Sequence, residues 1–518
     1  MSASDDPNEA RSHRTATSQQ MLELKEAAMT QQEKTWLYDE PTDHKPVDRV
    51  LEKYTLPFEL KPYQINAINE LAWVPRQGYY AEVGLGKTVM STVAALYGLD
   101  VFGVQRWFVI VPPILIRQWV RWLESLPGVT AVAYRGTPKK REQIPLDATF
   151  IVMSLQIFKA EHQKLRARLG DLKIGGIVDE ATCIKNTNTD NYRTVTRFFM
   201  GEPLMLLTGT PLSTPMDAYA YIKLLAPSIY RSKAHFEDRH VAERDFFGNV
   251  IEWGNLEDLA ANFACHSKRL LAREHLPELK EPIYTPIHYE LEGKHQRHYD
   301  QLAEEQIILL EKGGKLDATS EQGLYQALQQ IIMAPGPLLE DSNFRPTGYD
   351  VLDETLSELE VANLKGRKLV VATWYRNTSH AVNDYLNSER SGLWQGAATM
   401  IIGGLTDRQR EAALDKFTND DRCRVLIVQP GAAGKGVDGL QRFCHDMLFI
   451  EIPPTSIDFQ QLVGRLDRTG QTMPVNIRVA VAEKTVQMGI WANALTKDET
   501  ANRVQRSFKD LRKLVYGQ

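Results

Sequence analysis

The hydrophobic positions beyond residue 60 fall into short continuous apolar runs rather than into an alternating pattern. Four runs in the first half of the chain each end in a small, polar or proline residue: WFVIVP (107–112), TFIVMS (149–154), GGIVDE (175–180) and LMLLTG (204–209). Continuous runs rich in β-branched residues are typical of strands that are buried on both faces. Longer amphipathic stretches separate the runs, which predicts parallel βαβ units and one α/β lobe.

The same pattern returns in the second half of the chain and predicts a second α/β lobe. Its runs are KLVVATW (368–374), TMIIGG (399–404), RVLIVQP (424–430), DMLFIEIP (446–453) and NIRVAVA (476–482). Between the two sets, residues 219 to 347 are charged and helix-rich, with one strand predicted at 283–291. We interpret this middle segment as a bridge between the lobes, followed by a helical insertion in the second lobe.

These patterns divide the chain into four expected parts. They are a polar, partly disordered N-terminal segment (1–50), a first lobe that binds nucleotide (51–228), a helical bridge (229–280) and a second lobe (281–518) with a helical insertion at about 292–350. Within the first part, residues 1–17 have almost no large apolar side chain and are predicted to be disordered, whereas 19–38 have a helix-forming composition. The predicted fold class is α/β, with two parallel sheets flanked by helices.

Composition and charge exclude a protein that holds nucleic acid by overall charge. The chain has 518 residues, of which 43% are hydrophobic and 25% charged, as in an ordinary globular protein of several domains. Its net charge is −5 and its pI is near 6.2, so any grip on nucleic acid must be local. Basic stretches at 135–141, 164–173 and 268–273 are candidates, and a solvated surface explains each of them equally well.

The few cysteines and the lack of long apolar runs bear on the compartment. Cysteine occurs only at Cys183, Cys265, Cys423 and Cys444, and no two have the C-x-x-C spacing of a zinc or redox site. Structural metal and disulfides are therefore not expected. The N-terminus lacks the apolar segment of a secretory signal, and no apolar run approaches the length of a membrane span. We expect an intracellular, reducing compartment and no contact with a membrane.

The stretch AEVGLGKT (81–88), ahead of an apolar helical run, is typical of a phosphate-binding loop. Gly84 and Gly86 allow a tight turn that directs backbone N–H groups at an anion, and the following helix adds its positive dipole. Lys87 supplies a charge for the β and γ phosphates, and the Thr88 hydroxyl is placed to ligate Mg²⁺. The sequence therefore predicts a site for ATP and Mg²⁺.

The second half of this site is expected in GGIVDEAT (175–182), an apolar strand that ends in two carboxylates. Asp179 would hold Mg²⁺, directly or through water. Glu180 would orient and deprotonate the attacking water, a role worth roughly 10² to 10⁴ in rate. Paired acids at a strand end are common, so this interpretation depends on Lys87 upstream.

The order of motifs over residues 55–485 resembles helicase superfamily 2, and specifically its Swi/Snf-like branch. In the first lobe the similar motifs are LKPYQ (60–64), VPPILIRQW (111–119), IVMSLQIF (151–158), DEATCIKN (179–186) and LTGTPLS (207–213). In the second lobe they are GGLTDRQREAALDKF (403–417), GKGVDGLQ (434–441) and QLVGRLDRTGQ (461–471). CHSKRLLAREHLPEL (265–279) resembles the branch's link between lobes. The resemblance implies two RecA-like lobes that hydrolyse ATP in the cleft between them.

The resemblance also assigns roles to single residues. It implies that Gln64 reads adenine, that Gln461 leads the last motif, and that Arg465 and Arg468 are arginine fingers. Hydrolysis builds charge on the transferred phosphoryl group, and a guanidinium from a second body is worth roughly 10³ to 10⁵ in rate. Because the fingers and Lys87 lie on different lobes, ATP favours a closed pair and hydrolysis releases it, which produces relative motion.

A motor that moves over any sequence needs contacts to phosphates rather than to base edges. The positions expected to make these contacts are Pro113, Arg117, Ser154, Thr210, Thr373, Trp374, Gly403, Gly404 and Lys435. For most of them a packing or turn role explains the residue equally well, and only the family pattern favours nucleic acid. The resemblance implies duplex DNA rather than RNA, because the Swi/Snf-like branch works mostly on duplex DNA.

Three positions depart from the pattern. Ala81 stands where the widest form of the phosphate-loop motif has a glycine, which leaves the chemistry intact. Thr182 stands where the branch usually has His or Gln, so we expect tuned hydrolysis rather than lost hydrolysis. Asp467 lies between the two finger arginines, where a histidine is frequent, and its negative charge is expected to moderate them.

Four functions compete at this point. The first is an ATP-driven translocase that moves along duplex DNA or remodels protein–DNA complexes, and the second is a strand-separating helicase on DNA or RNA, which needs a wedge element. The third is a non-catalytic scaffold that binds nucleic acid. The fourth, a P-loop kinase or transporter ATPase, does not need a second lobe ending in QLVGRLDRTGQ. A compact motor of the first kind suits a bacterial or phage-infected cytoplasm.

Overall fold

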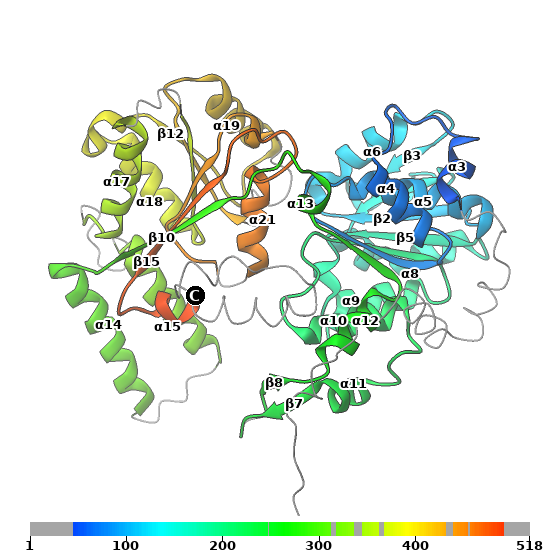
Figure 1. Cartoon of the computed structure of the whole chain (residues 1–518), viewed down its shortest axis with the longest axis horizontal. Coiled ribbons are helices and arrows are strands. Elements are labelled where there is room, and N and C mark those ends of the chain that lie inside the picture. Colours follow the sequence, from blue (N-terminus) through cyan, green and yellow to red (C-terminus); the bar gives the residue numbers. More distant parts are fainter. Residues whose placement is uncertain are drawn as a thin grey trace, which may run out of the picture.

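The computed structural model describes residues 45–246, 248–311, 318–335, 344–361, 367–430, 439–453 and 456–491. The predictions of disorder for residues 1–17 and of a helical composition for 19–38 lie outside these residues, as does most of the predicted motif at 434–441. Figure 1 shows the described chain as two lobes side by side. No helix in the described residues is long and apolar enough to cross a membrane.

The first lobe is built on a parallel sheet of seven strands in the order β3-β4-β2-β5-β6-β1-β9. The strands are β1 (Arg76–Ala81), β2 (Arg106–Val111), β3 (Ala131–Ala133), β4 (Phe150–Ser154), β5 (Ile174–Asp179), β6 (Leu204–Leu207) and β9 (Ser267–Leu270). The four apolar runs predicted in this half are β2, β4, β5 and β6. Every residue of β4, β5 and β6 is buried, which explains why these strands are apolar without alternation.

Helices cover both faces of this sheet. Its helices are α3 (Pro46–Leu51), α4 (Pro62–Leu71), α5 (Lys87–Val101), α6 (Ile116–Glu124), α7 (Pro138–Glu142), α8 (Leu155–Leu169), α9 (Asp190–Phe198) and α10 (Pro215–Leu225), with short 3₁₀ turns η2 (Pro113–Leu115) and η3 (Ala181–Ile184). One core cluster packs α3, α4, α5 and α6 against the sheet, and a second packs α8, α9 and α10 against it. Parallel strands need this cover, because both faces of the sheet are apolar.

The second lobe has a parallel sheet of six strands in the order β10-β15-β14-β11-β13-β12. The strands are β10 (Ile283–Tyr289), β11 (Leu369–Ala372), β12 (Ala398–Ile401), β13 (Val425–Val428), β14 (Asp446–Phe449) and β15 (Asn476–Ala482). Its helices are α14 (Gly293–Glu311), α15 (Ala318–Met333), α17 (Gly348–Val361), α18 (Arg376–Asn387), α19 (Asp407–Asn419) and α21 (Ser456–Leu466), with η4 (Glu389–Trp394) and η5 (Leu440–Arg442). The predicted fold class, two RecA-like lobes with parallel sheets flanked by helices, is confirmed.

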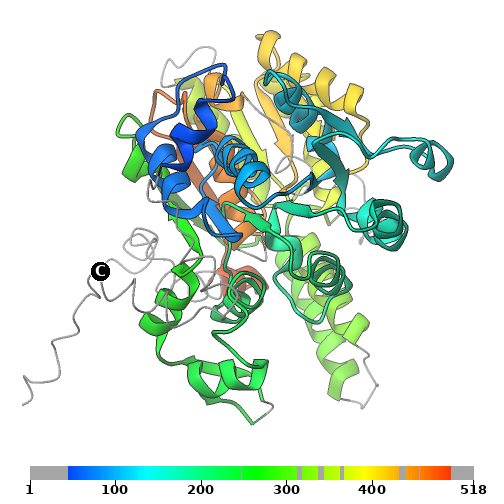
Figure 2. The ribbon, with the colours of Figure 1, turned by 90° about the vertical axis from the view of Figure 1, so that its right-hand side faces the viewer.

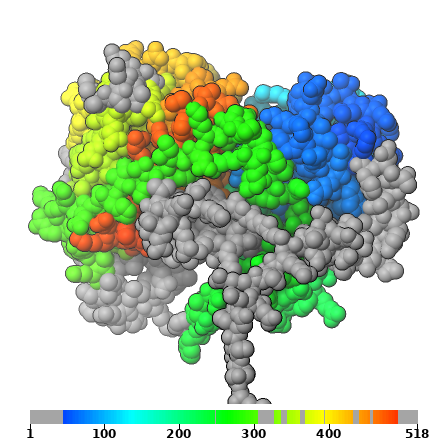
Figure 3. Space-filling model, in the orientation of Figure 1, coloured from blue at the N-terminus to red at the C-terminus, as the bar shows by residue number. Residues whose placement is uncertain are grey.

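The segment 229–280, expected to be a helical bridge, contains strands as well as helices. It holds α11 (Lys233–His240), an antiparallel hairpin of β7 (Val241–Arg244) and β8 (Val250–Trp253), α12 (Leu256–Ala264), β9 and α13 (Ala272–His275). Because β9 pairs with β1, the first sheet extends to residue 270. The sequence SKRL of β9 gave no strand signal, since this strand lies at the sheet edge with its two middle residues half-exposed. Figure 3 shows the remaining link, from α13 to β10, crossing the front of the junction.

Elements outside the two sheets extend from one side of the molecule. Figure 2, turned by 90° from Figure 1, shows the first lobe in front of the second. Both views place the hairpin β7–β8 and the pair α14 and α15 on the same side of the sheets. The expected insertion at about 292–350 corresponds to α14, α15 and the start of α17.

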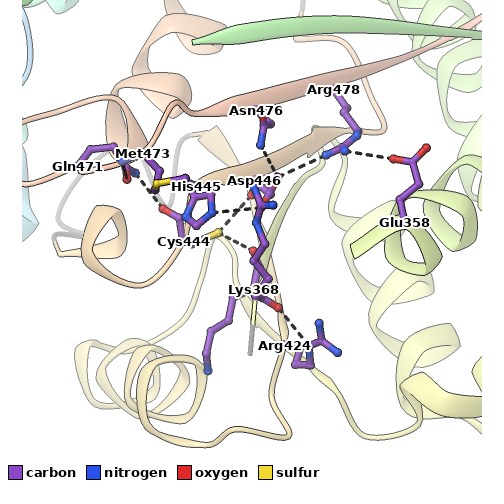
Figure 4. Close-up of polar contacts among 11 residues, drawn as sticks. Glu358, Lys368, Arg424, Cys444, His445, Asp446, Gln471, Met473, Asn476 and Arg478 are labelled. Atoms are coloured by element: carbon purple, nitrogen blue, oxygen red, sulfur yellow. Dashed lines mark hydrogen bonds and ion pairs between the residues drawn. The ribbon is translucent and has the colours of Figure 1, made fainter. Parts of the chain in front are cut away.

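The amino ends of three second-lobe strands are joined by an ion network around Asp446, shown in Figure 4. Asp446, at the start of β14, is fully buried and lies 2.6 Å from Arg367 Nε. Its Oδ1 accepts hydrogen bonds from Asn476 Nδ2 at 2.9 Å and Arg478 Nη1 at 3.5 Å. Arg478 also pairs with Glu358 of α17 at 3.1 Å. This network stabilises the sheet at its amino edge. Ligands of open α/β sheets bind at the opposite, carboxyl edge.

Candidate nucleotide site and lobe junction

The predicted phosphate loop connects β1 to α5. Gly84 and Gly86 have φ values of +91° and +82°, a left-handed conformation that residues with side chains rarely adopt. A Cβ at position 86 would also lie 2.4 Å from Gln64 Nε2, so the Gln64 side chain would have to shift to admit one. The glycines are therefore required by the backbone, as the sequence predicted for a loop that cradles an anion.

Lys87 begins α5, and its ammonium group lies over the loop. Its Nζ donates to Ala81 O at 2.6 Å and to Glu82 O at 3.3 Å. Burial lowers the pKa of Lys87. The charges of Glu180 and Asp179 oppose this shift, whereas those of Arg269 and Arg465 add to it. Both predicted carboxylates and one predicted finger arginine are thus close enough to influence this cation.

The two predicted catalytic carboxylates lie at the carboxyl end of β5. Asp179 is buried; its Oδ1 accepts from the Glu180 backbone N–H at 3.0 Å, and its Oδ2 accepts from Trp119 Nε1 at 2.9 Å. Burial, followed by the charge of Glu180, raises the pKa of Asp179. Glu180 has φ +55°, a conformation that strains a residue with a side chain and that is concentrated at functional sites. The Thr182 hydroxyl lies 3.5 Å from Glu180 O.

Thr88 and Asp179 together fit a magnesium ion in chemical type. A hydroxyl and a carboxylate are the hard oxygen donors that Mg²⁺ prefers, and both flank the lysine that would contact phosphates. Among the described residues no group of three or more His, Cys, Asp or Glu side chains gathers as a metal site. A magnesium ion would therefore depend on nucleotide phosphates and water for its other ligands, as is usual for this ion.

Gln64 contacts the phosphate loop directly. It is buried in the first turn of α4, its Oε1 accepts from Lys61 N at 3.0 Å, and its Nε2 donates to Leu85 O at 3.1 Å. These bonds tie the start of α4 to the loop between the two glycines. The contact with adenine stays a prediction.

The predicted finger segment of the second lobe packs against this loop. In Figure 1, α21 faces the first lobe. Thr469 Oγ1 donates to Gly84 O at 3.5 Å, and a Cβ at Gly84 would lie 3.6 Å from the Cβ of Arg468. A Cβ at Gly464 would lie 3.4 Å from Val83 Cγ2. The structure therefore brings the segment that carries Gln461, Arg465 and Arg468 to the glycine loop of the other lobe, although 385 residues separate Thr469 from Gly84.

Arg269 in β9 and Arg273 in α13 contact this junction, a role that the sequence analysis missed, since it named the stretch 268–273 only as a basic surface and as part of the link between lobes. Arg269 donates from Nη1 to Tyr80 O at 2.9 Å and to Gly209 O at 2.8 Å, and its Nη2 lies 3.4 Å from Glu82 Oε1. It therefore joins the phosphate-loop strand to the LTGTP loop. A basic residue in an edge strand gives no signal of such a role, because its partners are more than 50 residues away in sequence.

Arg273 is the second of these arginines, and it pairs with Asp467 at 3.0 Å. Burial raises the pKa of Asp467 to about 6, and the charge of Arg273 opposes the shift. The carboxylate that we expected to moderate the finger arginines therefore contacts the inter-lobe link. The sequence departure at this position is explained by a partner that lies on the link.

The residues predicted to contact nucleic acid divide into exposed and buried groups. Pro113, Arg117, Gly403 and Gly404 are exposed and Trp374 is half-exposed, whereas Ser154, Thr210 and Thr373 are buried and Lys435 lies outside the described residues. The Ser154 hydroxyl accepts from Ile157 N at 3.4 Å as the N-cap of α8. The Thr373 hydroxyl lies 2.7 Å from Ser379 Oγ. The backbone N–H of Thr373 also donates within the lobe, to Val428 O at 2.9 Å. Contact of Ser154 and Thr373 with phosphate stays a prediction.

Thr210 lies in the LTGTP loop, which packs on the phosphate loop. A Cβ on the preceding Gly209 would lie 3.7 Å from Lys87 Nζ, and Thr210 N donates to Thr208 Oγ1 at 3.2 Å. Thr210 is therefore placed beside the nucleotide site, and its predicted link to the nucleic-acid path remains a prediction.

The rim of the second lobe is held by two side chains that the sequence reasoning did not identify. Gln429, after β13, accepts from Gly403 N at 3.1 Å and donates to Trp374 O at 3.0 Å, so it joins two loops predicted to contact nucleic acid. Glu451, after β14, accepts from Trp374 N at 2.6 Å and Tyr375 N at 2.9 Å. Both residues directly follow an apolar strand run, which is the signal that could have identified them.

Glu451 gives the protein a pH-dependent stability. Burial raises the pKa of Glu451 to about 7, although hydrogen bonds from Thr378 and the two backbone amides act to lower it. Its pKa in the folded state therefore exceeds its pKa in the unfolded state. The folded state then holds the proton more tightly, and stability falls as pH rises from about 4.5 to about 7, by on the order of 3 kcal/mol. We expect Glu451→Gln to flatten this part of the profile in urea unfolding from pH 5 to 8. An unchanged slope would contradict the assignment to Glu451.

The fold and the junction together define a two-lobed P-loop ATPase core of the superfamily 2 helicase type. Residues 63–336, more than half of the 518 residues, match the SNF2-related domain, and residues 350–470 match the helicase conserved C-terminal domain. The chain therefore belongs to the SNF2-related family. The predicted resemblance to the Swi/Snf-like branch is confirmed.

Two relatives and one solved structure illustrate this similarity. The chain is 22% identical over 457 residues to the SWI/SNF chromatin-remodeling complex subunit snf22 of Schizosaccharomyces pombe, covering 83% of this chain and 26% of that protein. It is 23% identical over 425 residues to the uncharacterized ATP-dependent helicase YqhH of Bacillus subtilis, covering 78% of this chain and 72% of YqhH. The Sulfolobus solfataricus SWI2/SNF2 ATPase core in complex with dsDNA aligns with a TM-score of 0.41 at 19% identity, over 90% of this chain and 99% of that one. The chain spans about a quarter of the length of snf22.

Proposed function

We propose that this protein is an ATP-driven motor that moves along duplex DNA or remodels protein–DNA complexes. The observation that carries the proposal is the packing of the segment with Arg465 and Arg468 against the glycine loop that begins at Gly84. An ATP molecule on that loop would be enclosed by both lobes. Membership of the SNF2-related family supports DNA as the polymer.

The chemistry follows from the charges at this junction. Glu180 takes a proton from the attacking water, while Lys87 and the two arginines stabilise the charge that builds on the transferred phosphoryl group. Magnesium, when bound at Thr88 and Asp179, neutralises phosphate charge. Because the cations come from two lobes, release of the cleaved phosphate weakens the attraction between the lobes and allows them to part.

Motion along DNA requires grips on both lobes. Pro113 and Arg117 are exposed on the first lobe, and Gly403 and Gly404 are exposed on the second. Arg117 on the first lobe and the backbone N–H of Gly404 on the second are the donors that suit a phosphate, since Pro113 has no N–H and that of Gly403 donates to Gln429. If each holds a phosphate, opening and closing of the cleft changes the distance between the two grips. Phosphate contacts do not depend on base sequence, which suits a translocase.

The hairpin β7–β8 is the element that bears on the second candidate, a strand-separating helicase. Phe246 at its turn is 98% exposed, as a wedge would require. The strands also carry Glu243 opposite Glu252, and Asp245 lies at the turn. With Arg244 as the one cation of residues 241–253, these three carboxylates leave a net charge of −2 (one positive, three negative), which repels DNA phosphates. The charge of the hairpin therefore favours translocation without strand separation.

Phosphate release measured side by side with no polymer, single-stranded DNA, duplex DNA, forked DNA and RNA tests the proposal. We expect the strongest stimulation with duplex DNA, displacement of the third strand from a triplex, and no unwinding of the fork. Unwinding would favour the helicase, and no stimulation by any polymer would favour the non-catalytic scaffold. We also propose a cytoplasmic location, supported by the low cysteine content of four in 518 residues.

A further inference from the structure

The helix α6 connects the exposed first-lobe surface to the catalytic carboxylates. It is nine residues long and follows the turn η2, which begins at Pro113. Arg117 is exposed on one side of this helix, while Trp119, two residues later, is only 2% exposed and points into the core. Residues two apart lie on nearly opposite faces of an α-helix, so α6 presents a cation outward and an indole inward.

The inward contact ends on Asp179. The indole N–H of Trp119 donates to Asp179 Oδ2 at 2.9 Å in a buried environment, and 60 residues separate the two in sequence. The other oxygen of this carboxylate accepts from the Glu180 backbone N–H. With one fixed donor on each oxygen, the carboxylate cannot rotate without losing a buried hydrogen bond, which costs about 1–3 kcal/mol.

We infer that Trp119 is a positioning residue that holds Asp179 in place for magnesium. When the exposed face of α6 moves, Trp119 passes that movement on to the carboxylate of Asp179. The second part of this inference, the coupling between the α6 surface and Asp179, rests on the proposed function, because it needs DNA at Arg117. A two-turn helix moves as one body, so a phosphate that shifts Arg117 also shifts the indole. DNA would thereby change the orientation of the carboxylate without touching the nucleotide.

A matched control lies on the same helix. Trp122 Nε1 donates to Thr92 Oγ1 at 3.0 Å, so it also offers one indole N–H to a side chain of the first lobe. The Thr92 hydroxyl donates in turn to the backbone carbonyl of Thr88 at 2.7 Å, so the contacts of Trp122 end on the α5 backbone, not on a catalytic carboxylate or on the Thr88 hydroxyl. Replacing either tryptophan by Phe removes an N–H and part of a ring, but only Trp119→Phe removes a hydrogen-bond donor to Asp179.

The first test measures Mg²⁺ binding rather than turnover. With a fluorescent N-methylanthraniloyl ADP as the probe, we expect Trp119→Phe to weaken the apparent Mg²⁺ affinity about 10-fold while leaving ADP binding without Mg²⁺ unchanged, because loss of a partner to a metal ligand typically costs this much. Trp122→Phe should keep the wild-type Mg²⁺ affinity. Equal Mg²⁺ affinity in wild type and Trp119→Phe, or an equal loss in both variants, would overturn the inference.

Two further variants keep the test decisive. Replacing Trp119 by benzothienylalanine exchanges the N–H for sulfur at nearly the same volume, so it should repeat the Phe result even if Trp119→Phe folds poorly. Arg117→Ala should reduce the stimulation of hydrolysis by duplex DNA several-fold and leave Mg²⁺ affinity unchanged. If this variant lost both DNA stimulation and Mg²⁺ affinity, or kept both, the outer and inner faces of α6 would not have the separate roles that we infer. If wild type is not stimulated by any polymer, the proposed function fails, and the Mg²⁺ measurement still decides the contact with Asp179.

Discussion

Lys87→Ala is expected to reduce ATP hydrolysis by at least 10² to 10³-fold while duplex DNA binding stays measurable. Lys87 is the cation at the centre of the site: its ammonium group donates to two carbonyls of the loop and lies within the influence of Glu180, Asp179 and Arg465. Removing one donor that faces developing charge typically costs this much in rate. Steady-state phosphate release and a DNA mobility shift on the same preparation measure the two effects.

Lys53→Ala is the matched control for this variant. Lys53 also lies in the first lobe, but it forms an exposed ion pair with Asp100 at 2.6 Å away from the phosphate loop. Exposed pairs of this kind contribute little to stability, so its hydrolysis rate should equal that of wild type. If Lys87→Ala kept more than a tenth of the wild-type rate, the loop at 81–88 would not be the catalytic phosphate site.

Arg468→Ala is expected to lower kcat by about 10³-fold or more, with a much smaller change in ATP affinity. Its backbone segment packs on Gly84 from the other lobe, so its guanidinium can stabilise charge that appears only during phosphoryl transfer. Arg465→Ala should behave similarly, since Arg465 already influences the charge of Lys87. Single-turnover hydrolysis and equilibrium nucleotide binding separate the two effects.

Arg422→Ala provides the comparison for the finger variants. Arg422 is exposed and precedes β13, at the amino edge of the second sheet and away from the junction. The same loss of a guanidinium there should leave kcat unchanged. Equal losses of kcat and of nucleotide affinity in Arg468→Ala would mean that this arginine binds the ground state, and the finger assignment would be wrong.

The apolar runs predicted the fold well because parallel strands are covered on both faces. The runs at 107–112, 175–180 and 446–453 overlap β2, β5 and β14, whose residues are nearly all buried. The acidic residues of these strands, Asp179 and Asp446, stand at strand ends, so the apolar runs remain continuous. Strands with solvent on one side were harder to predict. The edge strand β9 has the sequence SKRL, and the hairpin strands β7 and β8 are largely exposed, so none of them has an apolar run.

Local sequence predicted the site where chemistry lies within a few consecutive residues, as in the loop at 81–88 and the pair Asp179 and Glu180. It did not predict contacts that depend on chain-distant packing. Trp119 reaches Asp179 over 60 residues and Arg273 reaches Asp467 over 194, and neither spacing has a sequence signature. The hydroxyls of Ser154 and Thr373 bond within the protein, and contact of these two residues with phosphate stays a prediction.

The shared nucleotide site of the two lobes is tested most directly by a crystal or cryo-EM structure with ADP, aluminium fluoride and Mg²⁺. We expect Lys87 and at least one of Arg465 and Arg468 to contact the fluoride that mimics the transferred phosphoryl group, each from its own lobe. Both guanidinium groups turned to the outer surface, with the fluoride held by the first lobe alone, would contradict the account.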